Sequence, residues 1–437
     1  MIQSMHSPLA FLHKPVAIIG MGMSGESVRK LLQFMGYQQD CMSTYDSRPG
    51  QAEYNDPQKM LKEKNPKTLI VSPGVPLASD WIQDFKESGG HITSELTIAL
   101  HFLAEEKIIG ITGSVGKSTT VSLLEAGLLQ FSPNSFVGGN LGRPLADYVL
   151  ELLQKKRKAA PWLVLELSSF QLENLEPLRC DYSAITYFTP NHMERYSSLE
   201  EYYAVKWSLL QKTTKSIVLN KNGGDLEKFS KGKKLSLPII WTDRYDESLM
   251  PLELEGAKLL GAHNQDNLAV AIRIAKEANW PQEAIHGMLK FPGLSHRMEN
   301  LGTFSGIHFV NDSKATTMES VKTAVHGIYD TMDRKNTLHV MLGGKDKNLP
   351  WEELQEFKKL QKCNFIFFGD VAALAQEKSK LDGQIFPKLS MSIVAIKQQA
   401  KAGDIVLLSP GGTSLDEFRS FEERGKIFEA LVRKNFS

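Results

Sequence analysis

A glycine-rich turn between an apolar run and a helical pattern is the feature that most constrains this 437-residue sequence. The apolar run Ile108–Ile111 predicts a buried parallel strand, and apolar residues recur at helical spacing after Thr120. Between them stands Gly113-Ser114-Val115-Gly116-Lys117-Ser118-Thr119. Such a turn lets backbone N–H groups and a helix N-terminus approach an anion, while the lysine reaches the outer phosphates of a nucleotide. We therefore expect a phosphate-binding loop in which the Ser118 hydroxyl is placed to ligate Mg²⁺.

The loop departs from the common phosphate-loop spelling, which places a further glycine where this chain has Ile111. An ordinary strand-to-helix turn with a solvated Lys117 is the alternative that this spelling leaves open. A buried strand directly before Gly-x-x-Gly-Lys-Ser favours phosphate binding.

Length and charge bound the class of protein. A chain of 437 residues is too long for one hydrophobic core, and about three domains are expected. Lys and Arg total 51 and Asp and Glu 50, so no global field attracts the chain to nucleic acid or to an anionic membrane. The three cysteines lack metal-ligand spacing, no apolar stretch reaches about 18 residues, and residues 1–14 do not form a convincing signal peptide. We expect a cytoplasmic protein with no nucleic-acid partner and no membrane insertion.

The first predicted domain carries a dinucleotide fingerprint. The strand Val16–Ile19 precedes Gly20-Met21-Gly22-Met23-Ser24-Gly25, and a second strand ends at Asp46, about 20 residues further on. Taken alone, this pattern predicts NAD binding with Asp46 on the ribose. The segment ends near Glu95, however, which leaves half of a dinucleotide fold and favours a single nucleotide. A merely polar strand end at Asp46–Arg48 stays open as the alternative.

The second predicted domain places polar side chains where its strands end. The buried strand Trp162–Glu166 ends on Glu166, at the sheet edge where open α/β sheets bind ligands. A carboxylate beside a phosphate loop suits Mg²⁺. A second strand, Tyr182–Thr186, leads into the polar cluster Asn191–Arg195. His192 in that cluster is either a capping or core residue or a functional one.

Further polar side chains lie on predicted helices of this domain. Lys206 lies within the predicted helix Leu199–Leu210, and a solvated helix lysine is the alternative to a functional one. Asn264 and Asn267 stand three residues apart and face the same way on another helix. The Pro/Gly break at Phe291–Arg297 marks the end of the domain.

The last part of the chain repeats strand, loop and helix four times from Ile307 onward. Its loops carry glycine, charged and hydroxyl residues, which predicts a second doubly wound sheet. Lys314 and Lys347 on two of these loops suggest a pocket for a small anion. The predicted class is α/β with three domains: a Rossmann-like half fold at 1–96, a P-loop-type ATPase sheet at 97–298 and a Rossmann-like sheet at 299–437.

Five motifs together resemble those of the Mur ligases over nearly the whole chain. They are Gly113–Thr119, Glu166–Glu173, Asn191–Arg195, Asn311–Thr316 and Ser409–Gly425. The resemblance is closest to members that add D-glutamate. It implies an ATP-dependent, amide-bond-forming ligase of peptidoglycan precursor synthesis that works through an acyl phosphate. The implied substrates are UDP-N-acetylmuramoyl-L-alanine and D-glutamate, the implied cofactors are ATP and Mg²⁺, and a monomer is expected.

The resemblance also implies roles for individual residues of the nucleotide and metal site. Lys117 and Ser118 would hold the ATP phosphates and one Mg²⁺, with Glu166 as a further ligand. His192 and Lys206 would serve a second Mg²⁺, with Lys206 carbamylated, because a carbamate supplies the oxygen donors that Mg²⁺ prefers. The implied catalytic residues are Lys117, His192 and Lys206. The positions that match other nucleotide contacts are Asn264, Asn267, Arg297 and Asp312.

Two substrate sites follow from the same resemblance. The glycine fingerprint is redirected from NAD to the pyrophosphate of UDP. The residues that match contacts with the UDP-linked substrate are Ser47, Arg48, Ser72, Asn140 and Ser168. Those that match the D-glutamate pocket are Lys314, Thr316, Lys347, Ser414, Leu415 and Phe421.

Two departures from the family pattern keep alternatives open. Ser114-Val115 replaces the usual Thr-Asn or Thr-Asp, and Gly411-Gly412-Thr413 replaces a run of small residues and cysteine seen in some relatives. The first change motivates a nucleotide-binding protein that has lost catalysis as one alternative. The others are a sister ligase for another amino acid, a folylpolyglutamate synthase, and a NAD-dependent oxidoreductase suggested by the first 50 residues alone.

Overall fold

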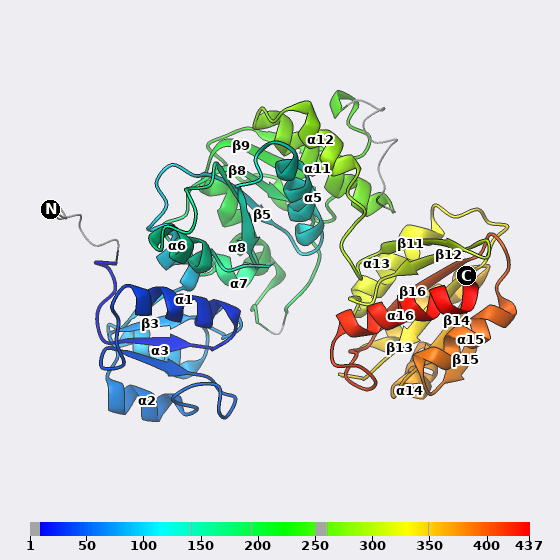
Figure 1. Ribbon diagram of the computed structural model, residues 1–437, viewed down its shortest axis with the longest axis horizontal. Coiled ribbons are helices and arrows are strands. Elements are labelled where there is room, and N and C mark those ends of the chain that lie inside the picture. The colour runs from blue at the N-terminus through cyan, green and yellow to red at the C-terminus, as the bar shows by residue number, and fades with distance from the viewer. Residues whose placement is uncertain (1–8, 141, 194, 250–258, 260, 348) are drawn as a thin grey trace. The chain divides into compact units, whose positions relative to one another are not determined.

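The computed structural model describes residues 9–437 except 141, 194, 250–258, 260 and 348. The chain divides into two compact units (Figure 1). The first unit comprises residues 1–253 and 266–288, and the second comprises 254–265 and 289–437. The first unit contains two of the three sheets and the second unit contains the third. The predicted α/β class is confirmed, and the three-domain boundaries stay a prediction.

The first sheet is parallel, with strand order β2-β1-β3-β4. Its strands are β1 (Val16–Ile19), β2 (Met42–Tyr45), β3 (Thr68–Val71) and β4 (His91–Thr93). Its helices are α1 (Met23–Phe34), α2 (Pro57–Lys64), α3 (Asp80–Glu87) and α4 (Glu95–Leu100). Successive residues of β1 point to opposite faces, so Val16 and Ile18 pack with α1 while Ala17 and Ile19 pack with α2 and α3. Both faces are covered, as a parallel sheet requires.

The central sheet has six parallel strands in the order β10-β9-β8-β5-β7-β6. They are β5 (Lys107–Thr112), β6 (Phe136–Gly139), β7 (Trp162–Glu166), β8 (Cys180–Ile185), β9 (Thr213–Asn220) and β10 (Ile239–Thr242). The helices are α5 (Lys117–Phe131), α6 (Leu145–Leu153), α7 (Ser169–Leu172), α8 (Leu199–Gln211), α9 (Leu226–Ser230), α11 (Ala262–Glu277) and α12 (Gln282–Leu289), with a 3₁₀ turn η1 (Glu247–Leu249). Because β5 lies in the middle, the loop that follows it has neighbouring strand ends on both sides.

The third sheet, in the second unit, has the order β11-β12-β16-β13-β14-β15, with only the β11–β12 pair antiparallel. Its strands are β11 (Glu299–Phe304), β12 (Ile307–Asn311), β13 (Leu338–Gly343), β14 (Cys363–Phe368), β15 (Gly383–Phe386) and β16 (Ile405–Gly411). Its helices are α13 (Met318–Tyr329), α14 (Ala372–Ser379), α15 (Leu389–Gln399) and α16 (Phe421–Phe436), with a 3₁₀ segment η2 (Trp351–Lys359). Two hydrophobic clusters cover its faces, one with α13, η2 and α14 and the other with α15 and α16.

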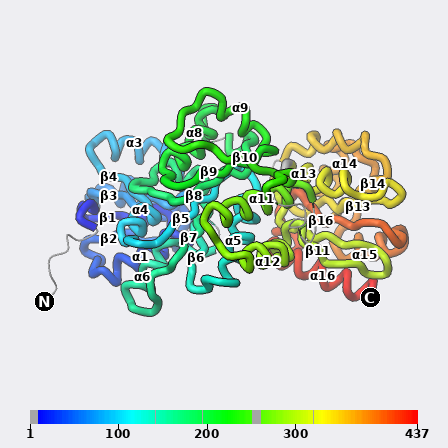
Figure 2. The backbone as a smooth tube through the Cα atoms, turned by 90° about the horizontal axis from the view of Figure 1, so that it is seen from above, coloured from blue at the N-terminus to red at the C-terminus, as the bar shows by residue number. Residues whose placement is uncertain are grey.

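The first and central sheets are joined by a shared core. Helix α6 packs on α1 and α4, and the three lie side by side in Figure 2. Val28 of α1 and Leu145 of α6 belong to one buried cluster. Two polar contacts cross the same junction: Ser27 Oγ donates to Asp147 Oδ1 at 2.7 Å, and the buried Ala146 N–H donates to Glu95 Oε1 at 2.6 Å. The two sheets therefore share a packed junction within the first unit.

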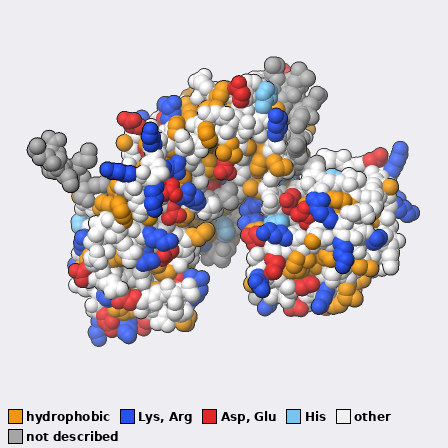
Figure 3. All heavy atoms as spheres, viewed as in Figure 1, with side chains coloured by type: hydrophobic (Ala, Val, Ile, Leu, Met, Phe, Trp, Pro, Cys, Tyr) orange, Lys and Arg blue, Asp and Glu red, His pale blue; other side chains and the backbone are white. Residues whose placement is uncertain are grey.

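Surface charge is mixed in sign. On the face drawn in Figure 3, lysine and arginine side chains are interspersed with aspartate and glutamate. Within the described residues, every helix is too short or too polar to span a lipid bilayer.

Substitution of Glu95 by glutamine is expected to stabilise the protein above neutral pH. Burial raises the pKa of the Glu95 carboxyl to about 7, although the Ala146 N–H opposes this. The folded state therefore holds a proton that the unfolded state releases at lower pH. This stabilisation is complete below about pH 4.5 and is lost as pH rises through about 7. We expect Glu95→Gln to raise the free energy of unfolding by about 1–3 kcal/mol near pH 8 and to change it little near pH 4.

Urea unfolding followed by tryptophan fluorescence at the two pH values measures the effect. Equal stability of the variant and the wild type near pH 8 would contradict the assignment.

Candidate active site

The loop after β5 forms the turn that the sequence predicts. Gly113 and Gly116 both have positive φ, at +149° and +87°, and Gly116 is the N-cap of α5. A Cβ at Gly113 would lie 2.2 Å from Thr186 Oγ1, and one at Gly116 would lie 2.4 Å from Asn267 Oδ1. Both positions therefore exclude a side chain, for reasons of conformation and of space. The N-terminus of α5 is left presented as an anion site.

Two lysines converge on the same carbonyl of this loop. Lys117 Nζ donates to the carbonyl oxygens of Gly113 at 2.8 Å and Ser114 at 3.1 Å, and Lys206 Nζ donates to Gly113 at 2.9 Å. The Lys206 residue is only 2% exposed. Burial, and next the charge of Lys117, hold the pKa of the Lys206 amine well below its usual range. The alternative of a solvated Lys206 is therefore wrong, and the amine is held in an environment that favours its neutral form.

The loop is anchored by hydroxyl groups, both its own and those of neighbouring segments of the same chain. Ser114 Oγ donates to the Thr189 carbonyl at 2.9 Å and accepts from the Tyr202 hydroxyl at 3.1 Å. Thr186 Oγ1 donates to the Val115 carbonyl. The residue at 115 thus contributes its backbone, which the change to valine leaves in place. Thr186 and Tyr202 were missed by the sequence analysis. Tyr202 precedes Lys206 by one helical turn, which was the available signal.

A buried carboxylate lies at the end of the neighbouring strand. Glu166 is 2% exposed and is the register partner of Ile111 in β5. Asn140 Nδ2 donates to Glu166 Oε1 at 2.8 Å, while Glu166 Oε2 has no hydrogen-bond partner among the described residues. An orphaned carboxylate oxygen fits a cation that binds through oxygen atoms. No group of three or more His, Cys, Asp or Glu side chains forms a metal site in the described part of the chain. A metal here would need phosphate or water oxygens as well, which is usual for Mg²⁺.

His192 lies on the turn after β8, in the left-handed conformation at φ +57°. Its ring packs against Phe170 of α7 at 4.8 Å between centroids and approaches Tyr202 at 6.4 Å. The Lys206 amine lies 4.8 Å from the centroid of the same Tyr202 ring. The structure therefore brings the predicted residues His192 and Lys206 to one tyrosine beside the phosphate loop.

A cavity of about 400 Å³ opens between the first sheet and the central sheet. Its lining includes four of the predicted substrate residues, namely Ser47, Arg48, Ser72 and Asn140, together with Gly20 and Gly22. A Cβ at Gly22 would meet no atom within 4 Å, so the N-terminus of α1 is open to a ligand. Ser168 does not line the cavity but caps α7, where its Oγ accepts from the N–H of Gln171, which does line it.

Asp46 is engaged within the chain. Its carboxylate accepts from the Met21 N–H at 2.8 Å and from Arg48 Nε at 2.9 Å and Nη2 at 3.0 Å. These bonds, the Arg48 side chain above all, hold the pKa of Asp46 well below its usual range. Asp46 therefore orients Arg48 at the cavity and is hydrogen-bonded to the first glycine loop.

The predicted nucleotide contacts divide between the two units. Asn267, in the first unit, has its side-chain oxygen beside Gly116. Asn264, Arg297 and Asp312 belong to the second unit. Asp312 accepts from Ser409 Oγ at 3.0 Å and from the Met298 N–H at 3.1 Å. Burial raises the pKa of the Asp312 carboxyl to about 7 despite these donors.

The predicted amino-acid pocket lies at the carboxyl edge of the third sheet. The Lys314 amine lies 4.4 Å from the centroid of the Phe421 ring, so the structure brings these two residues together. Ser414 is buried, Thr316 is half-buried, and Leu415 and Lys347 are exposed.

One residue at this edge was missed. The fully buried Arg424 donates to Ser313 Oγ and to the carbonyl oxygens of Ser313 and Gly412, and so ties two loops together. Burial lowers the pKa of its guanidinium to about 10.

Both the sequence and the fold of this chain are similar to those of known proteins. Residues 111–242 match the family model described as the Mur ligase middle domain. A UDP-N-acetylmuramoylalanine--D-glutamate ligase of Acidobacterium capsulatum is 30% identical and covers 96% of both chains. A protein of that name from Anaeromyxobacter dehalogenans is 33% identical over 83% of both chains. The crystal structure of MurF ligase from Thermotoga maritima in complex with ADP matches with a TM-score of 0.58 at 14% identity, covering 90% of this chain and 95% of that one.

Proposed function

The chain belongs to the Mur ligase family, and on that premise we propose that it joins D-glutamate to UDP-N-acetylmuramoyl-L-alanine with consumption of ATP. The observation that carries the proposal is the double position of Asn140. This residue lines the 400 Å³ cavity and also donates to Glu166 beside the phosphate loop. A substrate carboxylate in the cavity would therefore lie next to the outer phosphate of a nucleotide in the loop. The choice of D-glutamate follows the named relatives.

Each predicted residue keeps its role in this proposal. The ATP phosphates lie on Gly113, Ser114, Gly116, Lys117, Ser118 and Thr119, and the rest of the nucleotide on Asn264, Asn267, Arg297 and Asp312. Ser118 and Glu166 would hold one Mg²⁺, and His192 with carbamylated Lys206 would hold a second. The orphaned oxygen of Glu166 and the low pKa of Lys206 support these assignments, because a neutral amine is the form that reacts with CO₂.

The two other substrates take the remaining sites. The UDP-linked substrate binds Ser47, Arg48, Ser72, Asn140 and Ser168. D-Glutamate binds Lys314, Thr316, Lys347, Ser414, Leu415 and Phe421. The lysines among them offer positive charge to the two carboxylates of the amino acid.

The proposed chemistry starts from the weak reactivity of a carboxylate. Transfer of the γ-phosphoryl group of ATP to the alanyl carboxylate gives an acyl phosphate and ADP. The amine of D-glutamate, once it has lost its proton, attacks the acyl carbon, and the tetrahedral intermediate expels phosphate to leave the amide. Lys117 neutralises charge on the transferred group, and His192 would act in the same way. Bound Mg²⁺ would add charge neutralisation at the phosphate oxygens.

The reaction consumes ATP and a nucleotide-linked precursor, which supports a cytoplasmic location. We also propose that the protein acts as a monomer.

Phosphate release from ATP tests the proposal. We expect release that requires UDP-N-acetylmuramoyl-L-alanine, depends on Mg²⁺, and is much faster with D-glutamate than with L-alanine, L-lysine or diaminopimelate. A preference for another amino acid would indicate a sister ligase. Release with no amino-acid dependence, or quenching of tryptophan fluorescence by NADH in place of ATP turnover, would contradict the proposal.

A further inference from the structure

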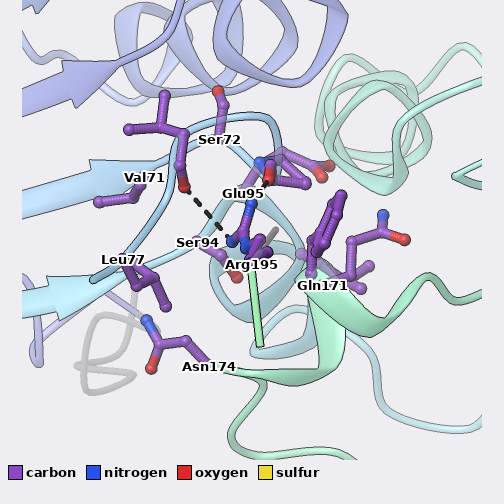
Figure 4. Close-up of a pocket in the computed structure, with 12 residues that line it drawn as sticks. Val71, Ser72, Leu77, Ser94, Glu95, Gln171, Asn174 and Arg195 are labelled. Atoms are coloured by element: carbon purple, nitrogen blue, oxygen red, sulfur yellow. Dashed lines mark hydrogen bonds between the residues drawn. The ribbon is translucent and has the colours of Figure 1, made fainter. Parts of the chain in front are cut away.

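Arg195 connects the central sheet's domain to the turn of the first domain that lines the substrate cavity. We call residues 72–75, which follow β3, the substrate turn. Arg195 Nη1 donates to the Pro73 carbonyl at 2.9 Å, and Nη2 donates to the Val75 carbonyl at 3.4 Å. Figure 4 shows the Arg195 side chain reaching in among Ser94, Glu95 and Gln171. One guanidinium thus holds two carbonyl groups of a turn about 120 residues earlier in the chain.

The other side of this guanidinium is held by the central sheet's domain. Nη2 also donates to Glu173 Oε2 at 2.8 Å, and the guanidinium stacks 3.9 Å from the centroid of the Phe170 ring. Glu173 Oε1 in turn accepts from the Tyr196 hydroxyl at 2.5 Å. The Arg195 and Glu173 side chains are only 10% and 15% exposed. The position of Arg195 is therefore defined by a desolvated ion pair and an aromatic face.

The contacts of Arg195 extend to the His192 turn and, through the substrate turn, to the first glycine loop. The Arg195 N–H donates to the His192 carbonyl at 3.0 Å, and both side chains pack on Phe170. On the opposite side, Ser72 Oγ donates to the Gly20 carbonyl at 2.7 Å, which links the substrate turn to the first glycine loop. The cavity beside Arg195 measures about 20 Å³, room for about one water molecule. The guanidinium consequently has little freedom to move.

We propose that Arg195 is a positioning residue that sets the substrate turn against the His192 turn and thereby tunes the affinity for the UDP-linked substrate. This proposal rests on the proposed function for the identity of that substrate. It concerns the first domain's ligand only, because no contact of Arg195 reaches the phosphate loop in the described residues.

Arg195→Lys isolates this role. Lysine keeps a cation for Glu173, but a single ammonium cannot reproduce the planar fork toward two carbonyls. We expect the dissociation constant and the KM for UDP-N-acetylmuramoyl-L-alanine to rise on the order of 10-fold or more, the scale of one lost charge-assisted hydrogen bond. The KM for ATP should change less than about twofold, within the scatter of independent sites. Glu173→Gln retains an acceptor for Arg195 and should give a smaller effect.

Arg273→Lys is the matched control. Arg273 Nη2 binds Asp246 Oδ2 at 2.8 Å, and the two side chains are 17% and 14% exposed, close to the values for Arg195 and Glu173. This control should leave both affinities unchanged. Equal weakening of ATP and UDP-substrate binding in Arg195→Lys, or no change in either, would overturn the proposal.

Calorimetric titration reads the affinities without turnover. Wild-type protein that binds the UDP-linked substrate but makes no product would count against the proposed function and leave the Arg195 comparison valid.

Discussion

Lys117→Ala is expected to abolish ATP-dependent phosphate release. The Lys117 amine bonds the carbonyl oxygens of Gly113 and Ser114, so it lies across the loop at the N-terminus of α5. A positive charge at that point stabilises the negative charge that moves during phosphoryl transfer. Loss of a preorganised group of this kind costs on the order of 10³-fold in rate. The effect is measured as phosphate released per enzyme with all three substrates present.

Lys107→Ala separates this effect from the general loss of a lysine charge. Lys107 begins β5, the strand that leads into the loop; it is exposed and lies 4.8 Å from the centroid of the Trp162 ring. Its removal should leave turnover within about twofold, as expected for a surface substitution. Near-normal turnover in Lys117→Ala would refute the assignment of the loop as the ATP site.

Lys206→Arg is expected to reduce turnover on the order of 10²- to 10³-fold, the scale of one lost charge-stabilising group. Arginine can still donate to the Gly113 carbonyl, but it stays protonated and forms no carbamate at this position. The structure favours a neutral amine at Lys206, because burial lowers its pKa. The substitution therefore removes the proposed oxygen donor while it retains a hydrogen-bond donor.

Two measurements check this prediction. Turnover of Lys206→Arg is compared with that of Lys212→Arg, which changes the C-cap of the same helix, where the lysine pairs with Glu176. A carbamate carbon signal in the NMR spectrum of wild-type protein given isotopically labelled bicarbonate provides a readout independent of turnover. Full activity of Lys206→Arg would contradict carbamylation, and the carbamate signal should be absent from that variant.

Several strands could be predicted from the sequence because the apolar pattern that marks them is local. The apolar runs of β5 and β7 stand out from their surroundings, and each ends at the polar residues that the sequence analysis singled out. Strands β6, β9, β10 and β15 were missed; β6 ends in two glycines and β15 consists mostly of exposed residues, so neither forms a clear apolar run. The antiparallel strand β11 was missed for a related reason: it packs at the sheet edge and has no fully buried residue.

The residues of the candidate site also divide into those with a local sequence signal and those without one. Gly113 and Gly116 were identifiable because the backbone conformation that they need excludes other residues. Glu166 was identifiable because parallel strands end at a common edge. Arg195 and Arg424 lie within the sequence motifs, but the sequence predicted no role for either of them. Their partners lie about 120 and 111 residues away in the chain.

The sequence alone determined the α/β class, the glycine-rich loop and which strands end in polar residues. Helical period, strand period and glycine conformation all act over a few residues. Only the tertiary structure decided that Lys206 is buried against the Gly113 carbonyl, that Asp46 is engaged by Arg48, and that Arg195 holds the substrate turn. Burial and partner choice depend on long-range packing, and packing also sets the pKa of a buried group. The loop that most constrains the fold was therefore visible from the start, whereas the groups that surround it emerged only when distant segments were brought together.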